Sequence, residues 1–195
     1  MLLGRKLPRS FYARSTVEVA RGLLGKVLVH GSTSGIIVET EAYLGGEDRA
    51  AHSARGLTER TRVIFGPPGH AYVYLIYGMY ECLNLVAERT GRPGCVLIRA
   101  LEPVSGVELM RARRGSTRKL EQLANGPGKL TLALGITRAH NGADVTRGPL
   151  VVHEAAGASE IEIEVTPRIG IARSVELPLR FAMAGNGFVS GRRRG

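Results

Sequence analysis

The fold is decided by a tyrosine-rich stretch that runs Tyr72-Val73-Tyr74-Leu75-Ile76-Tyr77-Gly78-Met79-Tyr80. Aromatic and aliphatic residues lie on both sides of Tyr77-Gly78-Met79, and they favour β-strands. The glycine permits the sharp reversal between them. Residues 72–87 are therefore predicted to form a β-hairpin. Four of the six tyrosines of the chain lie within these nine residues, so the hairpin concentrates aromatic rings.

Strands and helices are predicted on both sides of this hairpin. Hydrophobic patterns bounded by turn residues predict strands at residues 26–30, 35–43, 95–101, 150–153, 160–165 and 180–183. Start and stop signals predict three helices. The first is capped by Ser15 or Thr16 and ended by Gly25. The second is a basic helix that opens with a capping box at Ser105-Gly106-Val107-Glu108 and ends near Arg114, and the third runs from Asn125-Gly126-Pro127-Gly128 to about Leu134. Residues 44–70 predict a long functional loop with a helical turn near 48–52.

This order of elements indicates an α+β fold. Strands follow one another without regular intervening helices, which favours antiparallel pairing. No repeat or long linker divides the chain. We therefore expect residues 1–195 to form a single compact domain with a mixed, largely antiparallel sheet, flanking helices and a protruding β-hairpin. The basic tail, residues 191–195, is either a disordered end or an addition to a basic surface.

The composition excludes several classes of protein. The 195 residues are 44% hydrophobic and 23% charged, which is ordinary for a globular domain and unlike a disordered one. No apolar run approaches the roughly 18 residues of a membrane span, and the first residues lack the apolar segment of a signal peptide. The two cysteines, Cys82 and Cys95, are too few for a disulfide framework or a Cys-based zinc site. We expect a soluble, intracellular protein.

The charge balance points to nucleic acid. Lysine and arginine number 27 against 17 acidic residues, a formal net charge of +10. Nearly all of the basic residues are arginines, which bind phosphates with two hydrogen bonds at once. They are clustered, with five of them in residues 111–119 and three in residues 192–194. The alternative is a genome with arginine-rich codon usage and a protein that needs only solubility.

Two glutamates mark the strand Ile37-Val38-Glu39-Thr40-Glu41-Ala42-Tyr43. Alternation along a strand places Ile37, Glu39, Glu41 and Tyr43 on one face. Two buried, charged carboxylates this close are costly. Either both lie on a solvent-facing edge, or one lies at the end of the strand beside a pocket. There, burial and repulsion would raise its pKa and suit it to general-base catalysis.

The tyrosines of the hairpin admit two interpretations. Tyr72 and Tyr74 share a strand face, where they are either ordinary sheet residues or walls of a site. Tyr77 lies at the bend, next to Gly78, so its side chain is expected to project outward. On a basic protein this ring suits a wedge that fills the gap left when a base leaves the duplex. Tyr43 and Tyr74 could then offer aromatic faces to that base.

A glycine-rich turn at residues 125–129 predicts a phosphate contact. It places free backbone amides and Lys129 at the start of a helix, where anions bind well. Gly126-Pro127-Gly128 also resembles the glycine turn of helix-hairpin-helix glycosylases, in which Asp144 could be the catalytic aspartate. None of the five histidines has a partner at metal-ligand spacing, so no metal site is predicted. His52 by itself predicts only a hydrogen bond in a loop.

Several motifs together resemble the alkyladenine (3-methyladenine) DNA glycosylase family. The strongest blocks are residues 38–45, Glu47-Asp48 with Ala51-His52-Ser53, residues 72–80, Cys82-Leu83-Asn84 and residues 95–103. Weaker similarity continues through residues 126–130, 168–170 and 178–181. Glu81 departs from the resemblance, since it is acidic in a stretch that is apolar in the family. The long N-terminal extension of animal members is absent here, which fits a minimal bacterial enzyme.

The resemblance implies a mixed α/β fold and a cofactor-free enzyme that excises 3-methyladenine and other alkylated purines, with hypoxanthine as a further substrate. It implies these roles: Glu41 as the base that activates water; Arg99 and the Ile169 carbonyl as groups that hold the water; Tyr43, His52 and Tyr74 as walls around the flipped base; Asn84 as the group that rejects guanine; Tyr77 as the wedge with Met79 beside it; and Lys129 as a DNA contact. The expected partner is double-stranded DNA with damaged purines.

We expect a monofunctional enzyme. An alkylated, cationic purine is already a good leaving group, so the protein must chiefly deliver water to the sugar. No lysine falls within the pocket motifs, which favours hydrolysis over Schiff-base cleavage. The expected form is a monomer in the cytoplasm, associated with the nucleoid of a bacterium and not with a membrane. The alternatives are a non-enzymatic nucleic-acid-binding module and a helix-hairpin-helix glycosylase that uses Asp144.

Overall fold

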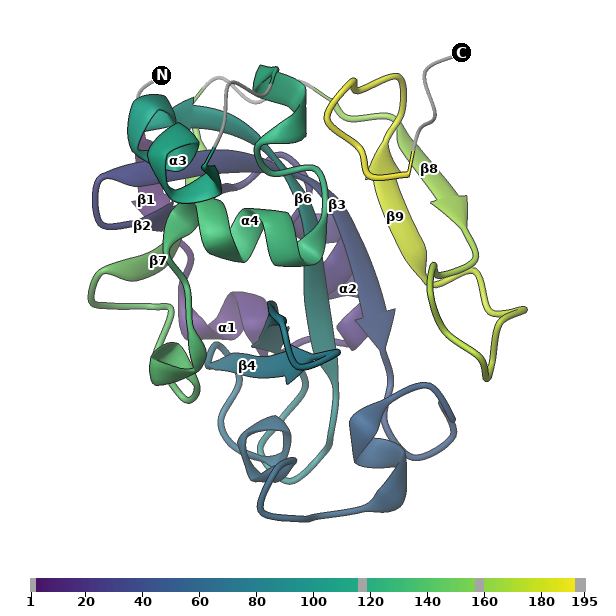
Figure 1. The fold of residues 1–195 in the computed structure, drawn as a ribbon. Helices are drawn as coiled ribbons and strands as arrows, with labels where there is room; N and C mark the ends of the chain where they lie inside the picture. The colour runs from purple at the N-terminus through teal and green to yellow at the C-terminus, as the bar shows by residue number, and fades with distance from the viewer. Residues whose placement is uncertain (1–2, 116–118, 157–159, 192–195) are drawn as a thin grey trace.

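A single antiparallel sheet organises the chain (Figure 1). The computed structural model describes residues 3–115, 119–156 and 160–191. Within them the strands are β1 (Leu3–Lys6), β2 (Val27–His30), β3 (Thr33–Tyr43), β4 (Ala71–Ile76), β5 (Tyr80–Val86), β6 (Cys95–Ser105), β7 (Leu150–Ala155), β8 (Ile163–Thr166) and β9 (Arg180–Met183). Their order is β1-β7-β2-β3-β6-β5-β4, and β9 pairs with both β3 and β8. The described pairs are antiparallel, which confirms the α+β prediction.

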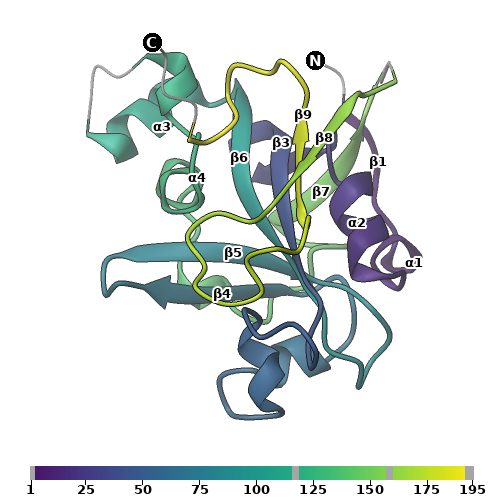
Figure 2. The same ribbon diagram turned by 90° about the vertical axis from the view of Figure 1, so that its right-hand side faces the viewer.

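Helices cover the sheet on two sides. They are α1 (Arg9–Tyr12), α2 (Thr16–Gly22), α3 (Val107–Arg114) and α4 (Pro127–Leu134), with 3-10 turns η1 (His52–Arg55), η2 (Arg62–Phe65), η3 (Leu120–Gln122) and η4 (Arg138–His140). Figure 2 shows α3 and α4 on one side of β3 and β6, with α1 and α2 on the other. None of the helices in the described ranges is long and apolar enough to cross a membrane.

The predicted hairpin is present and is formed by β4 and β5. The backbone N–H of Met79 donates to the carbonyl of Ile76 at 3.2 Å, and both residues between them, Tyr77 and Gly78, have positive φ angles of 52° and 69°. Positive φ at both central positions matches the twist of the flanking strands. A tyrosine rarely adopts this conformation, because its Cβ crowds the backbone. The turn therefore holds Tyr77 outward at a cost in strain, a pattern that favours a functional role.

Helix α4 supports this hairpin. A Cβ atom on Gly128 would lie 2.8 Å from the Cβ of Tyr80, so only glycine allows the helix to approach so closely. The hydroxyl of Thr131 donates to the carbonyl of Glu81 at 2.9 Å. The Glu81 carboxylate, the departure noted in the sequence, pairs with Arg138 at 3.1 Å. An acidic residue is thus accommodated at this position by a neighbouring arginine.

Several predicted boundaries were wrong. Ser105 forms no capping box, because it ends β6 and Gly106 precedes α3 without a side-chain cap. The turn predicted near residues 48–52 lies at η1 instead. The strand predicted from residue 160 begins at Ile163, and Val165 is exposed in spite of the alternating pattern. Ser15 does cap α2, through a capping box with Glu18. The tail residues 192–195 lie outside the described residues.

A β-bulge changes which residues of β3 share a face. The pairing of β3 with β6 shifts register between Ile37 and Glu39 and again before Thr40. Such a bulge adds an extra residue and so reverses the alternation. Ile37 consequently packs in the main core with Ala42, whereas Val38 belongs to a second cluster. The prediction that Ile37 shares a face with Glu39 was therefore wrong.

Candidate functional site

Glu41 is fully buried near the end of β3, which excludes the solvent-facing alternative. Its Oε1 atom accepts a hydrogen bond from the backbone N–H of Ile169 at 2.8 Å and pairs with Arg99 at 3.1 Å. Its Oε2 atom accepts from the hydroxyl of Tyr43 at 3.0 Å. Within the described part of the chain, Oε2 therefore has one donor and keeps a second acceptor position, since each carboxylate oxygen can accept two hydrogen bonds.

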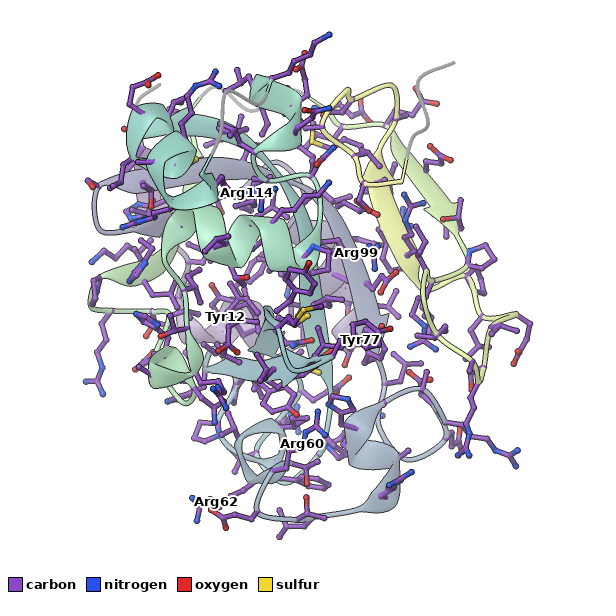
Figure 3. The ribbon with its side chains drawn as sticks, in the orientation of Figure 1. Tyr12, Arg60, Arg62, Tyr77, Arg99 and Arg114 are labelled. Carbon is purple, nitrogen blue, oxygen red and sulfur yellow. The ribbon has the colours of Figure 1, made fainter. Side chains whose placement is uncertain are left out.

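A cavity of about 800 Å³ lies next to the residues that bind this carboxylate, although Glu41 itself is not part of its lining. The three residues that bind Glu41, namely Tyr43, Arg99 and Ile169, all line it. It is bounded by the hairpin, the start of α4, η1 and the segment after β8. Arg99, Arg114 and Tyr77 all line this cavity, and in Figure 3 Arg99 lies between the other two. The structure thus brings the predicted base, its arginine and the hairpin tip to one site.

Aromatic side chains form one wall of the cavity. The His52 and Tyr74 rings meet edge to face with centroids 4.6 Å apart, and Tyr72 lies beside Tyr74 at 5.4 Å. Nδ1 of His52 is 2.9 Å from the hydroxyl of Tyr72. Arg60 donates to that hydroxyl at 3.3 Å and lies 5.3 Å from the centre of the Tyr74 ring. This network fixes the orientation of the rings before any ligand binds.

The aromatic walls are uncharged near neutral pH. Burial, followed by the neighbouring Arg60 and Arg55, lowers the pKa of His52 to about 4. Burial, followed by the Glu41 carboxylate, raises the pKa of Tyr43 far above its ordinary value. Burial also raises the pKa of Tyr74. The cavity therefore presents neutral rings to its ligand, with the charge located on Glu41 and the arginines.

Asn84 and both cysteines lie on the floor of the cavity. The amide nitrogen of Asn84 donates to the carbonyl of Tyr72 at 3.2 Å, and its oxygen accepts from the thiol of Cys95 at 3.9 Å. These contacts fix which way the amide faces. Cys82 and Cys95 are free thiols, and burial raises their pKa values to about 11 and about 12. They are therefore protonated, inert parts of the floor.

The mouth of the cavity carries the predicted DNA contacts. Tyr77 is 76% exposed and Met79 69% exposed, so the hairpin tip presents apolar surface to solvent. Lys129 lies in the first turn of α4, where its Nζ atom donates to Asn125 at 2.8 Å. It also lines the cavity. Lys129 lies outside the pocket motifs of the sequence, and it joins the lining because α4 packs against the hairpin from 50 residues further along the chain. Hydrolysis without a Schiff base stays a prediction.

Ile169 makes a contact with Glu41 that the sequence did not predict, and the expected role of its carbonyl in holding the water stays a prediction. Its backbone N–H, rather than its carbonyl, is the group in contact with Glu41. Asp144, the alternative catalytic residue, does not line the cavity. It is bound by Arg9 at 2.7 Å and Arg147 at 2.9 Å instead. The described residues contain no group of three or more histidines, cysteines or carboxylates that could hold a metal ion.

Sequence reasoning missed the buried ion pairs that hold the site together. Arg168 binds both oxygens of Asp48 at 2.5 and 2.7 Å, and it lies 4.6 Å from the centre of the Tyr43 ring. Arg180 pairs with Glu39 at 2.6 Å. Asp48 and Arg168 lie 120 positions apart, so no local pattern joins them. Both do fall within the blocks that carry the family resemblance, which was the one available signal.

A buried carboxylate beside an aromatic cavity on a basic surface is the arrangement of an enzyme that acts on a nucleic-acid base. The family model for methylpurine-DNA glycosylase matches residues 10–187. Two relatives are provisionally named 3-methyladenine DNA glycosylase. The one from Methanoculleus marisnigri is 54% identical over 192 residues, which cover 95% of this chain and 99% of the relative. The one from Rhodopseudomonas palustris is 50% identical over 188 residues, which cover 96% of this chain and 92% of the relative. The chain belongs to the methylpurine-DNA glycosylase family and is a DNA glycosylase.

Proposed function

We propose that the protein is a monofunctional glycosylase that hydrolyses the N-glycosidic bond of alkylated purines in duplex DNA. Its substrates are 3-methyladenine, 7-methylguanine and, as a neutral base, hypoxanthine. The observation that carries this proposal is the placement of Glu41, which is buried behind the cavity and bound by three residues of the cavity lining. A single positioned carboxylate is what water-mediated cleavage requires. The enzyme acts as a monomer and a single domain, residues 1–195, on the DNA of the cytoplasm.

The first step is extrusion of the damaged nucleotide. The bond to be cleaved is inaccessible inside the duplex, so the base must rotate out at a cost of a few kcal/mol. Tyr77 offsets this cost by occupying the vacated position, with Met79 beside it. Its outward conformation at positive φ supports this role, because the ring is already positioned before DNA binds.

The second step is recognition of the base in the cavity. Tyr43, His52 and Tyr74 line the cavity and offer rings on which a purine can stack. A purine methylated at N3 or N7 is a cation, and aromatic faces attract cations by about 0.5–2 kcal/mol. Asn84 lies on the floor, where its fixed amide rejects the exocyclic amino group of an undamaged guanine. Shape and hydrogen bonding select the base together.

The third step is hydrolysis. A water bound at the second acceptor position of Glu41 Oε2 attacks C1′ of the sugar while the bond from C1′ to the purine nitrogen breaks. Glu41 takes the proton from the water, and the electron pair of the broken bond leaves with the base. Arg99 and the Ile169 N–H hold Oε1, and the water of this proposal binds at Oε2, which accepts one hydrogen bond from Tyr43. The products are the free base and an abasic site.

The decisive experiment is incubation of the purified protein with methylated duplex DNA and chromatography of the released bases. We expect release of 3-methyladenine, and a loss of about 10²–10⁴-fold with Glu41→Gln while DNA affinity is retained. Glu102→Gln is the matched control, since Glu102 lies on the adjacent strand β6, binds Asn186 and does not line the cavity. Normal release by Glu41→Gln would refute the mechanism.

A non-enzymatic binding module is the alternative that this experiment tests directly. Such a module would bind the DNA with the same aromatic and basic residues and release no base from it. The presence of Lys129 in the cavity makes a second test necessary. We expect borohydride to trap no covalent complex between protein and DNA, since hydrolysis forms no Schiff base. A trapped complex that is lost in Lys129→Arg would show strand-cleaving chemistry instead.

A further inference from the structure

A second hollow of about 910 Å³ lies beside the base cavity, and no step above uses it as a site. It is formed by the segment between β3 and β4 together with Arg173 from the segment between β8 and β9. Arg49, Ala50, His52 and Arg173 line both hollows. The two hollows therefore lie side by side and share these lining residues, and we call the second one the arginine groove.

The arginine groove carries charge of one sign. Its lining contains Arg49, Arg55, Arg60 and Arg173 and no aspartate or glutamate. All four arginines are exposed, and among the described residues none of the four forms an ion pair. A concave surface with uncompensated charge focuses the electric field and attracts ions of the opposite sign.

The walls of the arginine groove are fixed without a ligand. Asp48 and Arg168 form a fully buried ion pair that joins the segment before η1 to the segment after β8. The backbone N–H of Arg49 donates to the hydroxyl of Ser174 at 3.2 Å across the same junction. The small residues of the lining, which let a chain approach closely, are Gly46, Ala50, Ala51 and Ala54. A groove that is already formed loses little entropy when it binds.

We propose that the arginine groove binds backbone phosphates of the DNA strand that carries the extruded nucleotide. The assignment of this strand rests on the proposed function, because a base held in the cavity brings its own phosphates close to Arg49 and Arg173, which line both hollows. The guanidinium groups match phosphate geometry with two hydrogen bonds each. Tyr77 lines the base cavity but not the arginine groove, so the contact with the strand and the wedge in the duplex are made by separate residues.

The first test measures affinity for a duplex that carries one alkylated purine as a function of salt concentration. It compares Arg55→Ala, Arg173→Ala and the double variant, each in a Glu41→Gln background that keeps the substrate intact. Each phosphate contact contributes about 0.9 to the slope of log K against log salt. We expect each single variant to lower the slope by about 0.9 and to weaken binding roughly five- to tenfold near 0.1 M salt. The double variant should lose about twice the slope.

Arg62→Ala is the matched control. Arg62 lies in the same segment, but it pairs with Glu59 at 2.9 Å and does not line the arginine groove. In Figure 3 its side chain projects from the outer edge of the molecule, away from Arg60 and Tyr77. We expect this variant to leave the salt slope within error of the wild type. Equal slopes for Arg55→Ala and the wild type would overturn the proposal.

The second test identifies the strand. Neutral methylphosphonates replace single phosphates next to a damaged nucleotide, on either strand, in binding assays with Glu41→Gln. We expect one or two positions on the damaged strand at which a methylphosphonate weakens DNA binding by the protein with an intact arginine groove. At these positions it should no longer weaken DNA binding by Arg55→Ala/Arg173→Ala. If the effect of a methylphosphonate depended on these arginines only at positions of the opposite strand, the strand assignment would be overturned. Both tests measure binding, so failure of base release would refute the catalytic proposal and leave this one to be judged separately.

Discussion

Glu39 and Glu41 lie two positions apart on β3, both are fully buried, and they differ in what surrounds them. Glu39 accepts four hydrogen bonds, from Arg99, from Arg180 and from both the backbone and the hydroxyl of Ser190. Glu41 accepts its bonds from Arg99, Tyr43 and Ile169, all of which line the cavity. Arg180 and Ser190 do not line it.

The difference shows how one residue type serves structure and chemistry on the same strand. Arg99 joins the two carboxylates, and their charges together keep its pKa above the ordinary value even though burial opposes this. Glu39 is shared between Arg99 and Arg180 inside the protein, and Glu39 and Glu41 together match the charges of these two arginines. Glu41 pairs with one arginine, Arg99, and all three of its partners line the cavity. The surroundings of Glu39 suit it to holding Arg99 in place, and those of Glu41 suit it to binding a water.

The largest expected effect separates these roles by stability. Glu39→Gln leaves Arg180 and Arg99 without their shared carboxylate, and removing one partner of a buried ion pair costs about 3–5 kcal/mol. We expect chemical denaturation to show a loss of this size for Glu39→Gln. Base release per folded molecule should fall far less than it does in Glu41→Gln, because the Glu41 carboxylate keeps its bonds from Tyr43 and Ile169.

Arg180→Gln provides the control for this comparison. It removes one cation from Glu39 but leaves Arg99 bound to both carboxylates. We expect it to lower the free energy of unfolding while the rate of base release stays near that of the wild type. If Glu39→Gln abolished base release in folded protein, the two glutamates would have to share the catalytic role, and the contrast would fail.

A smaller effect is expected at the mouth of the cavity. Tyr77→Ala removes the exposed ring, and aromatic stacking on a base is worth about 1–3 kcal/mol. We expect the fraction of extruded nucleotide, measured by 2-aminopurine fluorescence, to fall by roughly tenfold. The unfolding free energy should not change, since Tyr77 is exposed. Tyr77→Phe keeps the ring and should restore the signal; an unchanged signal in Tyr77→Ala would exclude the wedge role.

Local patterns predicted those parts of the fold that local forces determine. The hairpin could be predicted because Tyr77-Gly78-Met79 interrupts two stretches of strand-forming residues. Helix α4 could be predicted because Pro127 and the flanking glycines favour a helix start. The bulge between Ile37 and Glu39 could not, because it arises from the fit of β3 against β6. Alternation alone cannot detect one inserted residue.

The residue pattern alone proposed Tyr77, the rings of Tyr43 and Tyr74, and Lys129, whereas the roles of Arg99, Asn84 and Ile169 came only through the family resemblance. Composition and spacing singled out the two glutamates but not which of them faces a cavity. That distinction depends on Arg180 and Ser190, which lie 141 and 151 positions from Glu39. Arg60 gave no signal at all, since an arginine in a polar loop is ordinary. Its contact with the Tyr74 ring exists only in the folded chain.

The smallest expected effect concerns a third carboxylate, Asp144. Burial alone would raise its pKa, but hydrogen bonds from Thr146 and the charge of Arg9 lower it to about 2. Asp144→Asn should leave base release unchanged, because Asp144 does not line the cavity. It should cost about 1 kcal/mol or less, since Arg9 and Arg147 are partly exposed and water screens the pairs.

The pH dependence of stability makes this last contrast measurable. A carboxylate whose pKa is lower in the folded state stabilises the fold fully above its ordinary pKa, and this contribution is lost as the pH falls toward the lowered value. We therefore expect the difference in unfolding free energy between the wild type and Asp144→Asn to be constant above about pH 4 and to vanish near pH 2. A loss of base release in Asp144→Asn comparable to that of Glu41→Gln would instead favour catalysis by Asp144, and would remove the reason for assigning chemistry to the cavity side of β3.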